Sequence, residues 1–258
     1  MRPFEPRATR FRRAPGARPL VLGHRGARHA APENTLAAFE LARHEGADGV
    51  ELDVRLDGDR QLVVLHDPEL KRVTEGRSRA HAETLSTAAL RALDVGGGER
   101  VPLLSEVLAW AKEHDLCLNI EVKSDVREKR ALLDALVALL AQESAARERL
   151  LLSSFHPLFV LSLARRLPDL PVNWLVHQKQ VLLRFAPGYR ALGASGVNPE
   201  HTLLSANKVE RWHRSGALVG TWTVNDLELA VAYSKFGVDA LISDTPGRVL
   251  GALAKLDG

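Results

Sequence analysis

Short apolar segments alternate with longer amphipathic ones along most of the chain. Apolar runs predict buried strands at residues 19–23, 47–54, 116–123, 150–155, 172–177, 194–198, 218–224 and 240–243. Apolar side chains three or four positions apart predict helices at residues 36–46, 103–114, 126–143, 158–167, 180–184, 206–215, 227–236 and 245–256. Strands that alternate with helices favour parallel pairing, and eight such units are typical of a closed (β/α)8 TIM barrel. We therefore expect an α/β fold of this class.

Three stretches fall outside this alternation. Residues 61–65 form a short apolar run so close to the second strand that it predicts a β-hairpin with it. Residues from about 68 to 102 are polar, contain three successive glycines and lack a long apolar strand, which indicates a small inserted cap after the second strand. Residues 1–18 are rich in Arg and Pro and have no apolar core of a secretory signal, so we expect a disordered lead-in. The barrel domain is therefore expected to span residues 19–258.

The second predicted strand carries the densest chemistry. Glu51 and Asp53 are two residues apart, so on a strand their carboxylates lie on the same side. A hairpin turn centred on Gly58 and Asp59 would bring His66 opposite Glu51. Two oxygen ligands and one imidazole would then share a small volume, which is an arrangement for metal-assisted acid–base chemistry.

Further charged side chains follow neighbouring strand ends. Glu121 and Lys123 repeat the spacing of two, and three carboxylates in one cavity would repel each other without a cation. All-oxygen ligation suits Mg²⁺, Ca²⁺ or Mn²⁺. Three carboxylates, one divalent ion and one phosphodiester carry a net charge that Arg25 and Lys123 would cancel. The balance predicts a phosphodiester ligand.

Two histidines complete the candidate chemistry. His24 and His66 follow different predicted strands of the barrel. Imidazole titrates near neutral pH, so one could accept a proton from an attacking hydroxyl while the other donates one to the leaving oxygen.

The composition limits the kinds of partner and compartment that we expect for this protein. The net charge is +3 for 258 residues, and much of the positive excess lies in the first 18 residues, so a nucleic-acid footprint is weakly supported. The single Cys117 excludes an internal disulfide and suits a reducing compartment, so we expect a cytoplasmic protein. No apolar run approaches the roughly 18 residues that a membrane span needs. We expect a monomer or a homodimer that acts on a small molecule.

Seven short motifs, in order, resemble those of the glycerophosphodiester phosphodiesterases, within the wider group of phospholipase-C-like barrels. The motifs are His24-Arg25-Gly26, Pro32-Glu33-Asn34-Thr35, Glu51-Leu52-Asp53-Val54, His66-Asp67, Asn119-Ile120-Glu121-Val122-Lys123, Trp222-Thr223-Val224-Asn225 and the stretch from Asp239 to Pro246. The resemblance covers residues from about 19 to 250. The chain departs from the usual Thr-x-Asp-Gly hairpin turn at residues 57–60, which leaves the turn type open.

The resemblance implies metal-dependent hydrolysis of glycerophosphodiesters to glycerol 3-phosphate and an alcohol. The glycerol hydroxyl of the substrate would attack phosphorus. The implied roles are His24 and His66 as acid and base, Glu51, Asp53 and Glu121 as metal ligands, Arg25 and Lys123 as phosphate contacts, and Trp222 beside the glycerol.

Alternatives remain open at this point. The same site could act on lysophospholipids as a lysophospholipase D, although the polar cap favours small deacylated diesters. A barrel that binds phosphate ligands without catalysis is a third reading. Lys123 could simply pair with Glu121 or Asp125, and Asp244 could cap the final helix rather than take part in the site.

Overall fold

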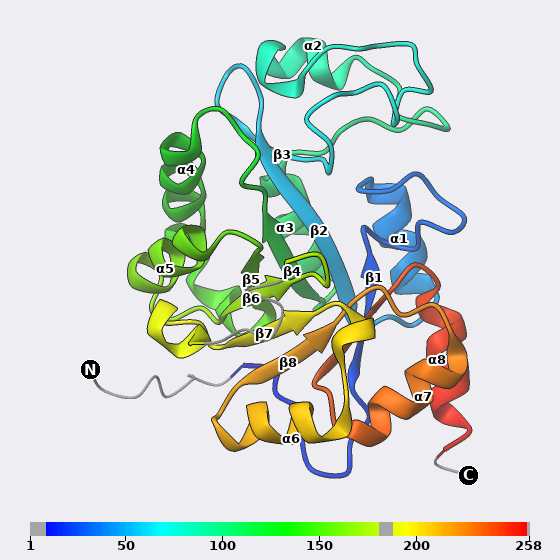
Figure 1. The fold of residues 1–258 in the computed structure, drawn as a ribbon. Helices are drawn as coiled ribbons and strands as arrows, with labels where there is room; N and C mark the ends of the chain where they lie inside the picture. The colour runs from blue at the N-terminus through cyan, green and yellow to red at the C-terminus, as the bar shows by residue number, and fades with distance from the viewer. Residues whose placement is uncertain (1–8, 181–187, 257–258) are drawn as a thin grey trace.

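Eight parallel strands close into a barrel in the computed structural model, which describes residues 9–180 and 188–256 (Figure 1). They are β1 (Leu20–His24), β2 (Gly49–Leu56), β4 (Cys117–Val122), β5 (Leu150–Ser154), β6 (Val172–Val176), β7 (Gly196–Pro199), β8 (Leu218–Thr221) and β9 (Ala240–Ser243). The barrel closes at β1, where Leu22 pairs with Ile242 on one side and with Gly49 on the other. The predicted (β/α)8 TIM barrel is therefore confirmed.

Helices cover the outside of the barrel (Figure 1). They are α1 (Leu36–His44), α3 (Leu104–Glu113), α4 (Lys129–Gln142), α5 (Pro157–Arg166), α6 (Ala206–Arg214), α7 (Leu227–Phe236) and α8 (Pro246–Ala254). Thr35 caps α1 by accepting a hydrogen bond from the amide of Ala38. The helix predicted at residues 180–184 lies almost wholly outside the described residues. Within the described chain, the helices are too short or too polar to cross a membrane.

The hairpin after β2 differs by one residue from the predicted pairing. Strand β3 (Leu62–Val64) runs antiparallel to β2, and Leu56 pairs with Leu62 rather than with Gln61. The reason is a three-residue turn, in which Arg60 adopts a left-handed φ of 61°. Asp57 holds the turn, because its carboxylate accepts hydrogen bonds from the amides of Asp59 and Gln61.

The extra turn residue also moves the candidate imidazole. The amide of Leu65, and not that of His66, donates to the carbonyl of Asp53, at 2.9 Å. The prediction that His66 lies directly opposite Glu51 is therefore wrong. His66 instead leaves the end of the hairpin and turns toward the open end of the barrel, where it lines the same cavity as Glu51.

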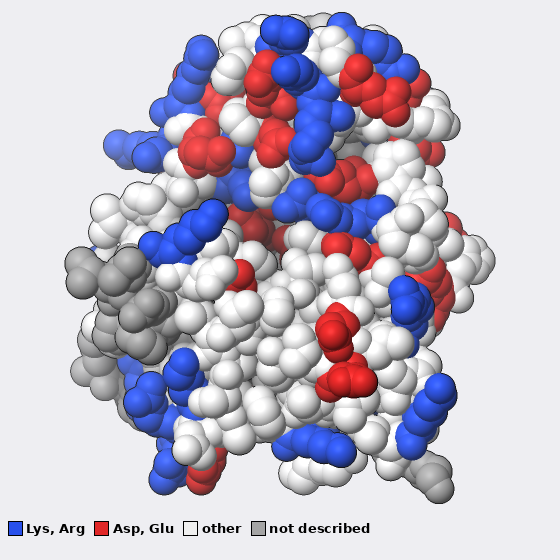
Figure 2. Space-filling model, turned by 45° about the vertical axis from the view of Figure 1, so that its right-hand side comes forward, with Lys and Arg blue, Asp and Glu red and all other residues white. Residues whose placement is uncertain are grey.

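Residues 68–102, the cap, lie beyond the carboxyl end of β2 and next to β3 (Figure 1). The cap contains a 3-10 turn, η1 (Ala82–Thr84), and a short helix, α2 (Thr87–Arg91), which the sequence did not predict. A small apolar cluster joins the cap to β3 through residues Val63, Leu65, Leu70, Ala82, Leu90, Val95 and Val101. Figure 2 shows charged side chains of both signs gathered over the cap, above a largely uncharged face.

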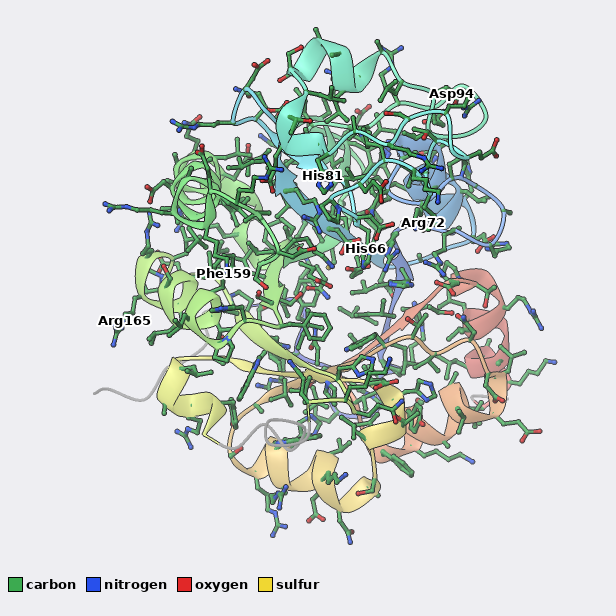
Figure 3. The ribbon with its side chains drawn as sticks, turned by 45° about the horizontal axis from the view of Figure 1, so that its top comes forward. His66, Arg72, His81, Asp94, Phe159 and Arg165 are labelled. Carbon is green, nitrogen blue, oxygen red and sulfur yellow. The ribbon has the colours of Figure 1, made fainter. Side chains whose placement is uncertain are left out.

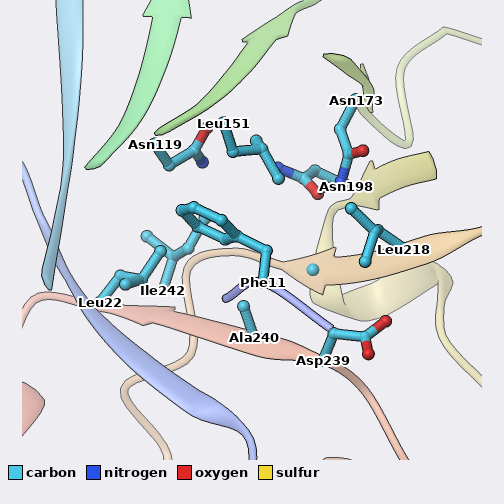
Figure 4. Close-up of a pocket in the computed structure, with 11 residues that line it drawn as sticks. Phe11, Leu22, Asn119, Leu151, Asn173, Asn198, Leu218, Asp239, Ala240 and Ile242 are labelled. Carbon is cyan, nitrogen blue, oxygen red and sulfur yellow. Dashed lines mark hydrogen bonds between the residues drawn. The ribbon is translucent and has the colours of Figure 1, made fainter. Parts of the chain in front are cut away.

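The N-terminal segment closes the other end of the barrel. Phe11 is only 2% exposed and packs inside the barrel against Leu22, Leu151 and Leu218, near the start of several strands (Figure 4). Arg12 donates to the carbonyl of Ala217, at 2.8 Å. The expected disorder therefore does not hold for residues 9–18, because a single aromatic side chain and several arginines anchor them. Residues 1–8 lie outside the described chain.

The barrel interior changes character along its axis. Near the starts of the strands it is apolar, with Phe11, Leu151 and Leu218 in one cluster. Further along β4 and β5, the inward side chains become polar, and Ser153 donates a hydrogen bond of 2.9 Å to Asn119 within the buried interior. Inward residues alternate with outward ones that pack on the helices. The Phe11 side chain is therefore a plug at the amino ends of the strands, and polar side chains lie toward their carboxyl ends.

Candidate active site

A cavity of about 210 Å³ opens at the carboxyl ends of the strands. Its walls are His24, Arg25, Glu51, His66, Asn119, Glu121, Ser153, Phe155, Leu175, His177, Trp222 and Ile242. Six of the predicted site residues are in this set, and the other two, Asp53 and Lys123, contact each other directly behind it. The structure therefore brings together all eight residues that the sequence singled out.

Three carboxylates meet on the floor of the cavity. Glu51, Asp53 and Glu121 each offer an oxygen within 4.8 Å of the other two. They come from adjacent strands, because Asp53 of β2 pairs with Glu121 of β4. Burial, together with the negative charges of Asp53 and Glu121, raises the pKa of Glu51 well above its ordinary value.

Two cations offset part of this negative charge. Lys123 Nζ lies 2.7 Å from Glu121 and 3.3 Å from Asp53, and Arg25 Nε lies 3.3 Å from Asp53. Burial by itself would raise the pKa of Asp53, but Lys123 and Arg25 lower it below its usual range. Lys123 thus forms the predicted pair with Glu121, whereas Asp125 binds Arg55 instead.

The donor set of the cluster fits a hard divalent cation. Asp53 Oδ1 is buried and accepts no hydrogen bond within the described structure, and the nearest cation, Lys123 Nζ, lies 3.3 Å away. Metal ligation would give this oxygen a closer positive partner. The three carboxylates supply only oxygen ligands, which suit Mg²⁺, Ca²⁺ or Mn²⁺. The residues present therefore fit such an ion, with Glu51, Asp53 and Glu121 as its protein ligands.

His24 lies at the end of β1, and a carboxylate from the loop after β9 holds its imidazole. Its Nδ1 lies 2.6 Å from Asp244, which also accepts a hydrogen bond of 2.7 Å from Asn225. Its Nε2 faces Glu51 at 3.9 Å. Burial lowers the pKa of His24 below its ordinary value. Asp244 does not cap α8, since Thr245 occupies the cap position, and it belongs with the site.

His66 is held in the same way from the hairpin. Its Nδ1 lies 2.6 Å from Asp67, and its carbonyl oxygen accepts a hydrogen bond of 2.8 Å from the buried Arg55. Burial lowers the pKa of His66, although the charge of Asp53 opposes the change. Both histidines therefore place Nδ1 against an aspartate, which favours a proton on Nδ1 and leaves Nε2 able to accept one.

Aromatic side chains form the wall away from the carboxylates. The rings of Phe155 and Trp222 meet edge to face at 5.4 Å, and His177 lies 5.8 Å from Trp222. Trp222 is fixed by its indole N–H, which donates to the carbonyl of Asn198 at 2.8 Å. The wall is therefore rigid and partly apolar, and it faces the charged floor across the cavity.

Several contacts of the site were not predicted from the sequence. Asp67 and Asp244 lay within the quoted motifs, but their pairing with histidines depends on the fold of the loops. Asn34 adopts a left-handed φ of 57° and donates a hydrogen bond of 2.9 Å to Asp53. Arg55 is 1% exposed, and nothing in its sequence position shows that it reaches the carbonyl of His66.

Known proteins resemble this chain over most of its length. The profile of the glycerophosphoryl diester phosphodiesterase family matches residues 24–248. A glycerophosphodiester phosphodiesterase of Caldanaerobacter subterraneus subsp. tengcongensis is 33% identical over 92% of this chain and 98% of its own. A probable glycerophosphodiester phosphodiesterase 1 of Mycobacterium tuberculosis is 34% identical over 89% of this chain and 90% of its own.

Solved structures share the fold as well. A phosphodiesterase of Oleispira antarctica, in complex with the product sn-glycerol-3-phosphate, superposes with a TM-score of 0.82 at 29% identity, covering 92% of this chain and 97% of its own. A crystal structure of a putative glycerophosphoryl diester phosphodiesterase from Silicibacter pomeroyi gives a TM-score of 0.84 at 26% identity, over 95% of this chain and 96% of its own.

Proposed function

This chain belongs to the glycerophosphoryl diester phosphodiesterase family, whose members hydrolyse phosphodiesters, and we propose that it releases glycerol 3-phosphate and an alcohol from glycerophosphodiesters in a metal-dependent reaction. One observation carries the proposal. A single cavity is lined by two histidines, each anchored at Nδ1 by an aspartate, and by two of three clustered carboxylates, the third of which, Asp53, lies directly behind it.

The charges of the site support a diester as the ligand. Glu51, Asp53 and Glu121 carry three negative charges when ionised, and Arg25 and Lys123 carry two positive charges. A divalent cation and a singly charged phosphodiester together add one positive charge, so the filled site is neutral. In a buried cavity, neutrality avoids the large desolvation penalty of an unpaired charge.

A divalent ion bound by Glu51, Asp53 and Glu121 would supply positive charge to the phosphate oxygens. Arg25 and Lys123 would orient the diester through the same oxygens. Nε2 of one histidine would accept the proton of the attacking glycerol hydroxyl, and Nε2 of the other, in its protonated form, would donate to the leaving alcohol oxygen, which leaves a cyclic phosphate. Water would then open this ring to glycerol 3-phosphate, with the two histidines in exchanged roles. Each such transfer typically contributes about 10²–10⁴-fold to the rate.

The aromatic wall and the small volume of the cavity favour a glycerophosphodiester over a lysophospholipid as the substrate. Trp222 and Phe155 offer apolar surface to the carbon skeleton of glycerol or of the leaving alcohol. The volume of about 210 Å³ is below the roughly 300–1,000 Å³ of typical pockets for drug-sized ligands. We therefore place lysophospholipids second, as substrates whose acyl chain would have to lie outside the cavity.

Compartment and assembly stay with the expectations from the sequence. We propose the cytoplasm, since Cys117 is the single cysteine of the sequence and is a buried free thiol, as suits a reducing compartment. The proposed assembly is a monomer or a homodimer.

The test is an assay of glycerol 3-phosphate from glycerophosphocholine with Mg²⁺ or Ca²⁺, beside an EDTA control. His24→Ala should abolish release, while His44→Ala, an exposed histidine on α1, should not change it. Release that persists in His24→Ala would contradict the assigned chemistry. Release from lysophosphatidylcholine but not from glycerophosphocholine would instead support the lysophospholipase D reading. Phosphate binding by a folded, metal-loaded protein without turnover would support a non-catalytic barrel.

A further inference from the structure

Glu33 binds three arginines between the barrel and the cap. It lies in the loop before α1, and its side chain is only 12% exposed. Its carboxylate lies 3.0 Å from Arg25, 3.4 Å from Arg28 and 2.7 Å from Arg72. The pKa of Glu33 is lowered: burial alone would raise it, but Arg72 and Arg25 hold the carboxylate ionised. Such a shared, nearly buried carboxylate differs from an isolated surface ion pair.

Two of these arginines continue to the aspartates behind the histidines. Arg28 Nε lies 2.8 Å from Asp244, which binds Nδ1 of His24. Arg72 Nε lies 2.5 Å from Asp67, which binds Nδ1 of His66. An unbroken series of charged groups therefore runs from one imidazole to the other, with Glu33 at its midpoint.

The series also joins two parts of the molecule. Arg28 and Asp244 belong to loops of the barrel, whereas Arg72 belongs to the cap. Figure 3 shows His66 and Arg72 close together where the cap meets the barrel. The cap therefore contacts the site through a residue that also orients the aspartate of His66. In this network the carboxylates of Glu33, Asp67 and Asp244 face the guanidinium groups of Arg28 and Arg72, and Arg25 is shared between Glu33 and Asp53 of the carboxylate cluster.

We propose that Glu33 is a positioning residue that fixes both imidazoles at once, and that Arg72 makes docking of the cap part of the same alignment. The inference rests on the proposed function, in which both histidines exchange protons with the substrate. Without the carboxylate of Glu33, the guanidinium groups of Arg25, Arg28 and Arg72 would face one another without a shared counter-charge. Arg28 and Arg72 would then turn toward solvent. Asp67 would lose the guanidinium that holds it against His66, and Asp244 would keep only Asn225 beside His24.

Kinetics of Glu33→Gln, Arg72→Gln and the double variant test the proposal. We expect each single change to lower kcat by about 10- to 100-fold, as loss of an outer-shell partner does elsewhere. Because Glu33 serves both arms of the network, the double variant should fall no further than Glu33→Gln alone. KM should rise in Glu33→Gln, which also frees Arg25, and should change less in Arg72→Gln.

The matched control is Arg77→Gln. Arg77 is another half-exposed cap arginine, but it pairs with Asp94, at 3.4 Å, and not with the network. In Figure 3, Asp94 lies farther into the cap than His66. This variant should keep kcat within about twofold of the wild type. A kcat of Glu33→Gln within twofold of the wild type, or losses that multiply in the double variant, would overturn the proposal.

A spectroscopic readout separates this inference from the proposed function. In ¹⁵N-labelled wild-type protein, the imidazoles of His24 and His66 should show the tautomer with the proton on Nδ1. Their signals are assigned by their loss in His24→Ala and His66→Ala. Glu33→Gln should shift both toward mixed tautomers, and Arg77→Gln should shift neither. Unchanged tautomers in Glu33→Gln would overturn the inference even in a protein that lacks turnover, whereas a wild type without turnover would count against the proposed function alone.

Discussion

The two ends of the barrel use the same eight strands for opposite purposes. At the amino end, Phe11 packs against apolar side chains, and the void between it and three buried asparagines, Asn119, Asn173 and Asn198, is only about 10 Å³ (Figure 4). At the carboxyl end, the strands present buried carboxylates, imidazoles and cations around a cavity of about 210 Å³. Close packing stabilises the first end, whereas the second keeps like charges together. The contrast indicates that stability and activity are separated along the barrel axis.

The largest effect on activity is expected from a substitution of Glu51, at the carboxyl end of the barrel. Glu51→Gln removes a carboxylate whose pKa is raised well above normal by burial and by its acidic neighbours. We expect kcat/KM to fall by more than about 100-fold, because a metal ligand is lost. The melting temperature should stay the same or rise, because the repulsion decreases. Glycerol 3-phosphate release and thermal unfolding of the metal-free protein measure both. A clear loss of stability would contradict the division between the ends.

Phe11→Ala should show the reverse pattern. The substitution leaves a cavity in the apolar interior, and truncating a buried Phe typically destabilises a protein by about 3–5 kcal/mol. The kcat of the folded variant should be unchanged, since Phe11 packs at the far end from the cavity of the site. Denaturant unfolding and the hydrolysis assay check the two parts. Phe11→Leu is the control and should lose much less stability, whereas equal losses would show that Phe11 is not a packed plug.

A smaller effect is the pH dependence of stability at the site end. Burial lowers the pKa of both His24 and His66, so the unfolded chain binds protons more readily than the fold does. Stability of the metal-free protein should therefore decrease as pH falls below the unfolded value of about 6.5, by at most about 1.4 kcal/mol per pH unit for each histidine. His66→Gln should reduce this slope. A slope of the opposite sign would mean that the folded site favours the imidazolium form.

The smallest effect is expected from the arginines around the plug. Arg18 forms an ion pair of 2.6 Å with Asp48, and both side chains are partly exposed. Arg18→Gln should destabilise the protein by about 1 kcal/mol or less, as is usual for exposed ion pairs. Urea unfolding in low and high salt measures it, and the difference from wild type should shrink in high salt. A loss as large as that of Phe11→Ala would assign the anchoring of the segment to charge rather than to packing.

Prediction from the sequence succeeded where the signal was local. The spacing of Glu51 and Asp53 places both on one side of a strand, independently of the rest of the fold. In the structure their carboxylates do lie together. The predicted hairpin register is wrong by one residue, because Arg60 adopts a left-handed conformation that a non-glycine residue seldom takes. One turn residue was enough to displace His66 from its expected partner.

Prediction failed more fully where contacts are distant in sequence. Asp244 meets His24 across 220 positions, and Arg72 meets Glu33 across 39, so no local pattern reports either pair. The ordered structure of residues 9–18 could not be predicted, for a related reason. Phe11 is a single apolar residue among arginines, and its burial depends on an opening that exists only after the barrel has closed.

The most direct measurement of the metal-dependent site is the kcat for glycerophosphocholine of protein stripped with EDTA, before and after adding back Mg²⁺, Ca²⁺ or Mn²⁺. We predict that stripped protein is inactive and that activity returns at one bound ion per chain. Glu51→Gln should bind the ion more weakly than the wild type in a parallel titration. Full activity of the stripped protein, or equal ion binding by Glu51→Gln, would contradict the assignment of the carboxylate cluster as the metal site.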